Sequence, residues 1–301
     1  MTLIPSKKLI CILGPTAVGK TAVAIELAKH LNTEILSADS RQFYQELSIG
    51  TAKRSAKELA AVQHHFIGHI SIHQSYSAGD FERDALKRLE ELFKKHNVVV
   101  AVGGSGLYVK ALLEGLDKMP EGDEQLRNEL YQLFESNGIN ALQERLIQVS
   151  PESASAIDMN NTQRVMRAIE IAEGGGLNKD IIKQPRAFQT LEIILNRPRE
   201  ILYNRINKRV DEMIAAGLID EAKQLLPHKD LYALQTVGYT ELFEAFEGKM
   251  TTEQAITLIK QHSRNYAKRQ ITWFKRQSNA HWFEPEQLNE IFTCVESFIK
   301  Q

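Results

Sequence analysis

The stretch "LICILGPTAVGKTAVAIELAKHL", residues 9–31, decides the fold. It begins with a short apolar run, continues into a glycine-bounded segment and ends in an amphipathic helical pattern. The middle segment fits the phosphate-binding loop pattern G-x-x-x-x-G-K-[ST]. Backbone N–H groups and a helix N-terminus can surround an anion there, Lys20 adds a positive charge, and the Thr21 hydroxyl suits Mg²⁺. The residues of this predicted phosphate site are Gly14, Pro15, Thr16, Ala17, Val18, Gly19, Lys20 and Thr21.

Further apolar runs predict the strands of the same sheet. Most are continuously apolar, as strands buried on both faces tend to be, and helical patterns lie between them. This alternation predicts an α/β fold with a mostly parallel sheet flanked by helices, like that of the P-loop NTPases. The predicted strands are 9–14, 34–38, 98–104, 191–196 and 281–283.

The alternation of strands and helices stops after residue 117. Residues 123–173 show only helical patterns and turns, and the strand signal resumes at 191. The sequence therefore predicts a catalytic core made of residues 1–117 and 190–301, with a small helical domain, 118–189, inserted between its two parts.

Composition limits the classes of protein that remain. The 301 residues carry a formal charge of -1, so a nucleic-acid partner has to be met by local basic patches. Two cysteines give neither a disulfide framework nor a cysteine zinc site. No apolar run reaches membrane-spanning length, and the N-terminus lacks the core of a signal peptide. We expect a cytoplasmic protein, a monomer, with no membrane partner.

Polar residues follow two of the predicted strands. "LSADSRQFY" (36–44) places Asp39 beyond the second strand, where it could accept a proton from an incoming nucleophile or simply cap a helix. "GGSGLY" (103–108) places Ser105 at the same edge, because ligands of open parallel sheets bind beyond the carboxyl ends of the strands.

Three helical patterns carry arginines and lysines. In 199–217, Arg205 and Arg209 share a face, and one of them could reach a pyrophosphate. In 250–276, Lys260, Arg264, Lys268 and Lys275 lie on one side with no acidic residue from 254 onward, which favours an anionic partner. In 160–173, Arg164 and Arg167 are three residues apart.

The residues alone leave three functions open. One is a P-loop small-molecule kinase or hydrolase that uses ATP. The second is a transferase that uses a non-nucleotide pyrophosphate with a nucleic-acid acceptor, which the basic helices favour. The third is a nucleic-acid-binding module with a regulatory nucleotide site, which the polar residues gathered around the loop disfavour.

Motifs along nearly the whole chain resemble those of one family. "GPTAVGKT", "ILSADSRQ", "IGTAK", "YSAGDFERDA", "VGGSGLYVKALLEGL", "NTQRVMRAIEI", "VGY" and "AKRQITWF" occur in that order. In this order they resemble the bacterial tRNA dimethylallyltransferases, also called tRNA isopentenyltransferases. The resemblance implies transfer of a dimethylallyl group from dimethylallyl pyrophosphate to N6 of adenosine 37, next to the anticodon.

The resemblance also implies roles for individual residues. The phosphate loop would hold the donor pyrophosphate with Mg²⁺ near Thr21, Asp39 would act as the base, and Arg209 would hold the leaving group together with Lys20. Ser105 would contact the target nucleotide. The remaining implied tRNA contacts are Ser40, Arg41, Gln42, Arg127, Gln163, Arg164, Val165, Met166, Arg167, Gly238, Tyr239, Lys268, Arg269, Gln270 and Trp273.

The chain departs from the family pattern at three positions. Arg54 and Gln63 stand where relatives often have Pro, and Gly68 stands near the place of an Asp. These departures bear on local loop geometry rather than on the chemistry.

Overall fold

We analysed a computed structural model of the chain. It describes residues 7–117, 123–176, 185–277 and 279–301. The chain divides into two compact units, the first formed by Met1–Glu114 with Arg186–Gln301 and the second by Gly115–Pro185. The predicted domain edge at residue 118 lies outside the described residues.

Unit 1 is built on a six-stranded sheet in the order β3-β2-β4-β1-β5-β6. Every strand pairing in the described part of the sheet is parallel. The strands are β1 (Lys8–Leu13), β2 (Ile35–Ala38), β3 (His64–His65), β4 (Val98–Gly103), β5 (Gln189–Leu195) and β6 (His281–Phe283). Of these, only the two-residue β3 was not predicted, because a pair of histidines carries no apolar signal.

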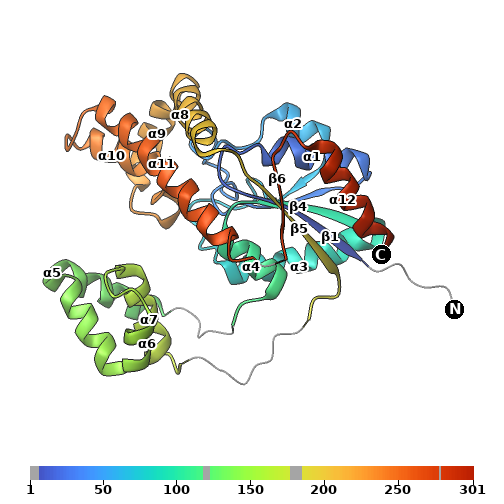
Figure 1. Cartoon of the computed structure of the whole chain (residues 1–301). Helices are drawn as coiled ribbons and strands as arrows, with labels where there is room; N and C mark the ends of the chain where they lie inside the picture. Colours follow the sequence, from blue (N-terminus) through green and yellow to red (C-terminus); the bar gives the residue numbers. More distant parts are fainter. Residues whose placement is uncertain (1–6, 118–122, 177–184, 278) are drawn as a thin grey trace. The chain divides into compact units, whose positions relative to one another are not determined.

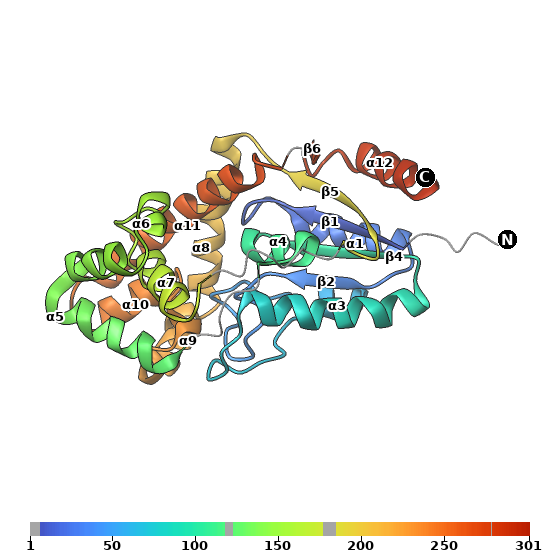
Figure 2. The same ribbon diagram turned by 90° about the horizontal axis from the view of Figure 1, so that it is seen from below.

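Helices cover both faces of the sheet, as Figures 1 and 2 show. Side chains of β1 alternate between the faces: Leu9, Cys11 and Leu13 belong to the core with α3, while Ile10 and Ile12 belong to the core with α1. This double burial explains why the strand sequences are continuously apolar.

Some helices of unit 1 match helical patterns of the sequence, among them α8 in 199–217 and α11 in 250–276. Helix α3 begins after Ser77, which forms a capping box with Asp80. Helices α1, α4 and α8 follow the carboxyl ends of β1, β4 and β5, α12 packs against β5, and α9, α10 and α11 pack mainly against other helices. Their bounds are α1 Lys20–His30, α2 Ala56–Ala61, α3 Ala78–Lys95, α4 Gly106–Glu114, α8 Arg199–Ala215, α9 Leu218–Leu225, α10 Tyr239–Phe246, α11 Thr252–Phe274 and α12 Leu288–Lys300, with 3₁₀ turns at Leu226–His228 and Tyr232–Leu234.

Unit 2 is helical in its described part. It contains α5 (Glu124–Val149), α6 (Pro151–Ala156) and α7 (Thr162–Glu173). Gly138, at φ 71°, breaks α5 into two helical stretches. The unit has its own small core of Leu130, Leu142, Leu146, Val165, Met166 and Ile169.

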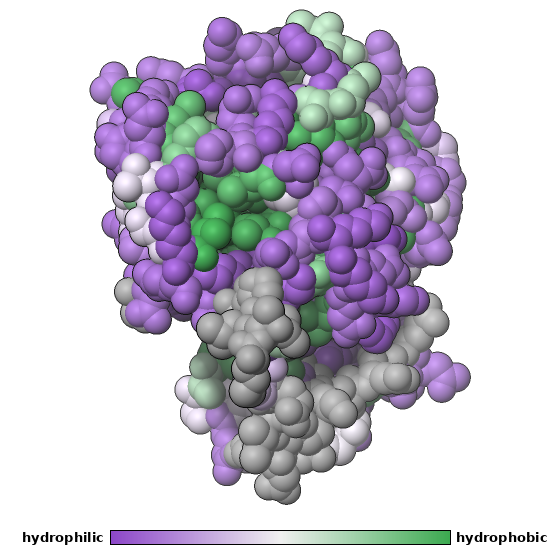
Figure 3. Space-filling view, turned by 90° about the vertical axis from the view of Figure 1, so that its right-hand side faces the viewer, coloured by the Kyte–Doolittle hydropathy of each residue, from purple (hydrophilic) through white to green (hydrophobic). Residues whose placement is uncertain are grey.

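The face drawn in Figure 3 is largely hydrophilic, with hydrophobic residues visible between the hydrophilic ones, most extensively left of centre. Within the described residues, none of the helices combines the length and the apolar character that crossing a bilayer requires.

Candidate active site

The phosphate loop joins β1 to α1 with the geometry that its sequence predicts. Gly14 has φ +142°, and a Cβ there would lie 2.4 Å from the Leu195 carbonyl oxygen, so the neighbouring strand leaves room for glycine alone. Ala17 and Gly19 also have positive φ, at 61° and 118°. Gly19 is the N-cap of α1. The loop therefore curls at the positive end of a helix, which suits an anion.

Lys20 points back into this loop. Its Nζ donates to the Pro15 carbonyl oxygen at 2.7 Å. Burial lowers the pKa of Lys20 to about 7; Asp39 opposes this, while the positive charges of Arg209 and Arg54 add to it. The ammonium is thus held by the loop and by Asp39 but crowded by two guanidinium groups, which is an environment that a diphosphate would relieve.

Three arginines from the second half of the chain hold the loop. Arg209 Nη1 donates to the Thr16 hydroxyl at 3.4 Å, and Arg205 Nε donates to the Ala17 carbonyl oxygen at 2.9 Å. Arg197 Nε donates to the Val18 carbonyl oxygen at 2.9 Å. Arg205 and Arg209 of α8 therefore both reach the loop, where the sequence analysis expected one of them. Arg197 was missed, although it stands directly after β5 at the same sheet edge.

Asp39 lies in a tight turn at the end of β2. Its Oδ1 accepts the Arg41 N–H at 3.1 Å, and its carbonyl oxygen accepts the Gln42 N–H at 3.1 Å. The turn is tied to the end of β4, because the Ser40 N–H donates to Ser105 Oγ at 3.1 Å. Since β4 lies between β2 and β1, Asp39, Ser105 and the phosphate loop meet at one edge of the sheet.

A positive field surrounds the Asp39 carboxylate. Its charge acts on Lys20, on Arg209 and on Arg54. Burial lowers the pKa of Arg209, and Asp39 is the first of the groups that oppose this. A carboxylate beside cations that face a phosphate loop can accept a proton while those cations hold a leaving anion.

Arg54 is a buried cation that the sequence analysis noted only as a departure. It is 9% exposed, and its Nη1 donates to Gln42 Oε1 at 2.8 Å. Its Nε has no hydrogen-bond partner. Gln42 is 5% exposed, and its amide also donates to the Thr51 and Ala52 carbonyl oxygens at 3.2 and 3.3 Å. Gln42 therefore joins two loops, and the expectation that it contacts tRNA stays a prediction.

Helix α11 lies against the same edge. Gln270 is buried and bonded to both the phosphate loop and the end of β4, whereas Lys268 and Arg269 are exposed. The basic side predicted for this helix is not wholly free: Lys260 pairs with Asp211 of α8 at 2.6 Å, and Arg264 donates to Asn207 at 2.6 Å. In the described part of this segment, the exposed cations of that side begin at Lys268.

Comparison with known proteins decides the family. A model of the IPP transferases matches residues 42–277. The chain belongs to the IPP transferase family. It is 51% identical to a tRNA dimethylallyltransferase of Christiangramia forsetii, covering 98% of this chain and 99% of that protein. It is 47% identical to the tRNA dimethylallyltransferase of Cytophaga hutchinsonii over 98% of this chain and 99% of the other.

Solved structures agree with this assignment. A tRNA isopentenylpyrophosphate transferase from Bacillus halodurans matches with a TM-score of 0.73 and 38% identity, covering 98% of this chain and 97% of that one. A eukaryotic dimethylallyltransferase described as acting on tRNA matches with a TM-score of 0.73 and 26% identity, covering 92% of this chain and 74% of that one. The fold of this IPP transferase family member is therefore the P-loop NTPase-like fold of its relatives.

Arg41, which the resemblance assigned to RNA, is half-buried in unit 1. Arg41 lies beside the Asp39 turn, donates to the carbonyl oxygens of Tyr232 and Gln235 at 3.0 and 3.3 Å, and stacks over the Tyr232 ring at 5.0 Å. Tyr239, in contrast, is fully buried, and its hydroxyl donates to Glu221 at 2.6 Å. Gly238 beside it is also buried. Both residues are buried, and the expectation that they contact tRNA stays a prediction.

On α7 in unit 2, too, some of the residues assigned to RNA are exposed and others are buried. Gln163 and Arg164 are exposed, whereas Val165 and Met166 lie in the unit's core, and the expectation that these residues contact tRNA stays a prediction. Arg127 and Arg167 both bond the Glu170 carboxylate, at 2.8 and 2.7 Å. Helical periodicity explains the pattern, because a run of five residues turns through more than one face.

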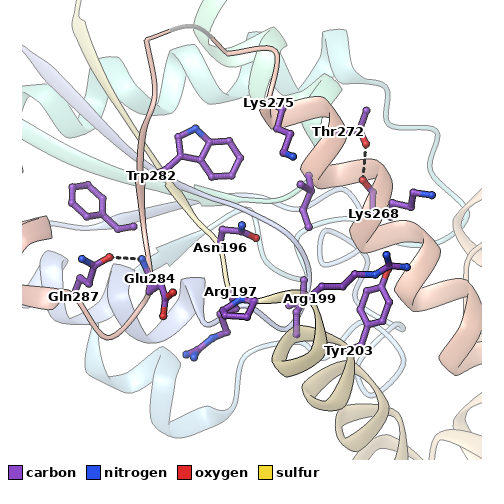
Figure 4. A pocket seen from close by; sticks show the side chains of 14 residues that line it. Asn196, Arg197, Arg199, Tyr203, Lys268, Thr272, Lys275, Trp282, Glu284 and Gln287 are labelled. Carbon is purple, nitrogen blue, oxygen red and sulfur yellow. Dashed lines mark hydrogen bonds between the residues drawn. The ribbon is translucent and has the colours of Figure 1, made fainter.

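A pocket of about 620 Å³ lies beyond the carboxyl ends of β5 and β6, beside the C-terminal part of α11. Figure 4 shows Arg199, Lys268 and Lys275 around it together with the rings of Tyr203 and Trp282. Arg197 lies between this pocket and Val18 of the phosphate loop, and its Nη2 also pairs with Glu286 at 2.6 Å. The pocket gives the site a positively charged approach on the side of the loop away from Asp39.

Proposed function

We propose that the chain transfers a dimethylallyl group from dimethylallyl pyrophosphate to N6 of adenosine 37 of tRNA and releases pyrophosphate. Its family and the names of its relatives support this reaction. The observation that carries the proposal is that the phosphate loop and Asp39 lie at the same edge of the sheet, with Arg209 of α8 bonded to the loop. A diphosphate anion suits the cations, and the Asp39 carboxylate lies among them.

The reaction breaks the bond between the allylic carbon and the diphosphate oxygen and forms a carbon–nitrogen bond. The costly step is the departure of a multiply charged anion, which Lys20, Arg209 and the N–H groups of the loop stabilise as its charge grows. The allylic carbon tolerates positive charge by delocalisation. The diphosphate leaves with the bonding electron pair.

The acceptor is a weak nucleophile, because the adenine N6 lone pair is delocalised into the ring. Asp39 would accept the N6 proton, and Ser105 would orient the base through its hydroxyl. A stacked base cannot reach such an edge, so the adenosine has to leave the stack, at a cost of about a few kcal/mol. Phosphate contacts from exposed Lys268, Arg269 and Arg164 would offset that cost.

The residues present fit Mg²⁺. Thr21 follows Lys20 at the start of α1, where its hydroxyl lies next to the loop that would hold the diphosphate. In the described residues, no group of three or more His, Cys, Asp or Glu side chains could hold a metal on its own. Mg²⁺ commonly takes few protein ligands and completes its shell with water and phosphate oxygens, which suits Thr21. The ion would supply charge neutralisation of the diphosphate.

We propose a cytoplasmic monomer. The groups named for the reaction all belong to one chain, so the chemistry requires no second copy. Light scattering of the purified protein with and without tRNA tests the monomer, and a dimer under both conditions would contradict it.

A prenylation assay tests the proposed function. The protein is incubated with Mg²⁺, dimethylallyl pyrophosphate and unmodified tRNA, and the nucleosides are then separated by mass. We expect N6-dimethylallyladenosine from position 37 and an equal amount of pyrophosphate. A parallel reaction with ATP tests the kinase alternative, which the relatives do not favour; ATP turnover without a prenylated nucleoside would overturn the proposal.

A further inference from the structure

One face of α11 packs on the run Gly103–Gly106 at the end of β4. Tyr266, Gln270 and Trp273 are four and three residues apart, so they lie on the same side of the helix. A Cβ on Gly106 would lie 2.5 Å from Trp273 Nε1, and a Cβ on Gly104 would lie 2.5 Å from Gln270 Nε2. These glycines let the helix approach the strand end closely.

Gln270 uses both ends of its side-chain amide in this contact. Its Oε1 accepts the Thr16 N–H at 2.8 Å, and its Nε2 donates to the Gly104 carbonyl oxygen at 2.8 Å. Its side chain is 7% exposed. A residue so placed links the phosphate loop to the strand end that carries Ser105, and little of it remains available to a large ligand.

Thr16 connects Gln270 to the leaving-group side of the site. Its N–H is held by Gln270, and its hydroxyl accepts from Arg209 at 3.4 Å. If Gln270 is lost, the Thr16 N–H loses its hydrogen-bond partner. Arg209, which donates to the hydroxyl of the same residue, then changes position with Thr16. The position of the loop and the position of its arginine are therefore set together.

We propose that Gln270 is a positioning residue for the diphosphate-binding loop and not an RNA contact, an inference that rests on the proposed function for the identity of the donor. It acts through Thr16 and Gly104 rather than by touching the acceptor. Its neighbours Lys268 and Arg269 are exposed on the other side of the helix. In this short segment of α11, Gln270 on one face positions the phosphate loop, while Lys268 and Arg269 on another face are accessible to RNA.

The test compares Gln270→Met with Arg269→Met. Methionine keeps the volume of Gln270 but makes neither hydrogen bond, and Arg269→Met is the matched control on the exposed face. Binding of inorganic pyrophosphate with Mg²⁺ is measured by calorimetry, and tRNA binding is measured by filter retention. Steady-state assays give the KM for dimethylallyl pyrophosphate and kcat separately.

For Gln270→Met we expect pyrophosphate binding to weaken about ten- to hundredfold, because two buried hydrogen bonds are lost. The donor KM should rise with it, while the tRNA Kd stays within about twofold. Arg269→Met should do the reverse, weakening tRNA binding in a salt-dependent way while pyrophosphate binding is unchanged. Weakened tRNA binding by Gln270→Met with unchanged pyrophosphate binding would overturn the proposal.

Two further measurements keep the test decisive. Gln270→Glu retains an oxygen for the Thr16 N–H but adds a negative charge beside the diphosphate, so it should weaken pyrophosphate binding more at low salt than at high salt. Equal pyrophosphate affinity for this variant and the wild type would contradict the proposal even if Gln270→Met failed to fold. Pyrophosphate binding needs no prenyl transfer, so failure of the proposed reaction would be seen separately, in the wild-type assay.

Discussion

Asp39 lies in a turn that is held by backbone and neighbouring side-chain hydrogen bonds as well as by the Asp39 carboxylate. The Gln42 N–H bonds the Asp39 backbone, and Ser40 is tied to Ser105. Asp39→Ala should therefore leave the turn in place and remove only the carboxylate. We expect the single-turnover rate of prenyl transfer to fall by about 10²–10⁴-fold, because a proton acceptor is lost, while tRNA binds nearly as before.

Rapid-quench measurements with enzyme in excess check this prediction. Asp39→Asn is the control for shape, since it keeps the acceptor of the Arg41 N–H but cannot take up a proton at neutral pH. An unchanged single-turnover rate in either variant would remove Asp39 from the role of base.

Lys20 should make donor binding depend on pH. Burial lowers its pKa to about 7 in the free protein, so the ammonium loses its charge as pH rises through that value. A bound diphosphate favours the charged form, so binding above pH 7 should take up a proton at Lys20 and should weaken as pH increases. Calorimetry of pyrophosphate binding at pH 8 in buffers of different ionisation enthalpy counts these protons.

The number of protons taken up by the wild type is compared with the number taken up by the Lys20→Met variant. Pyrophosphate itself changes protonation near neutral pH, and the variant measures that contribution without the lysine. We expect the wild type to take up more protons than Lys20→Met. The same count in both proteins would show that Lys20 does not change its charge on binding.

Helix α11 carries two kinds of cation along its basic side. Lys260 pairs with Asp211 of α8, whereas Lys268 and Arg269 extend into solvent. The double variant Lys268→Glu/Arg269→Glu should weaken tRNA binding and reduce the slope of log affinity against log salt by about one to two units. Lys260→Glu should instead lower the free energy of unfolding by up to about 1 kcal/mol and leave tRNA binding almost unchanged.

Titrations with unmodified tRNA at several salt concentrations, together with urea unfolding, separate the two effects. Equal loss of tRNA affinity from the Lys260 change and from the double change would show that the whole side of the helix contacts RNA.

The elements of the core could be predicted because each strand is buried on both faces. Predicted and observed bounds of β1 differ by one residue, 9–14 against Lys8–Leu13, and those of β6 coincide. The break in α5 at Gly138 was not predicted, because glycine inside a helical pattern does not by itself say that φ becomes positive. The short strand β3 was not predicted, because its two histidines give no apolar signal.

From the sequence, only those site residues could be predicted that belong to motifs with a chemical role. The phosphate loop and Asp39 follow directly from strand ends, and the family resemblance implied Arg209. Arg197, Arg54 and the bonds of Gln270 depend on which surfaces meet in three dimensions, and no spacing along the chain contains that information. Burial of Tyr239 likewise depends on Glu221, 18 positions away in the sequence.

At the scale of the whole molecule, the separate cores of the two units predict separate responses to mutation. Burial raises the pKa of the Glu170 carboxyl, but hydrogen bonds from Arg127 and Arg167 outweigh this and hold the pKa below its usual value. Glu170→Gln should destabilise unit 2 by about 1–3 kcal/mol, because charged hydrogen bonds to a buried carboxylate are weakened. Unit 1, with its own core, should be unaffected.

Hydrogen exchange with mass spectrometry checks this locally. We expect faster exchange in peptides from α5 and α7 and unchanged protection in β1 and β4. Glu173→Gln, which breaks the exposed pair with Arg145, is the control and should change exchange much less. Faster exchange throughout both units would contradict the prediction.

The pairing of β1 with β5 has a consequence for how the protein is made. Lys8 lies beside Gln189, so the strand that leads into the phosphate loop can pair with β5 only after about 180 further residues have been synthesised. At roughly 5–20 residues per second, a ribosome needs about 10–35 s to supply it. Arg197, Arg209 and Gln270 emerge later still. During synthesis the nascent chain therefore exposes an apolar strand edge, and the proposed diphosphate site is complete only when translation is nearly finished.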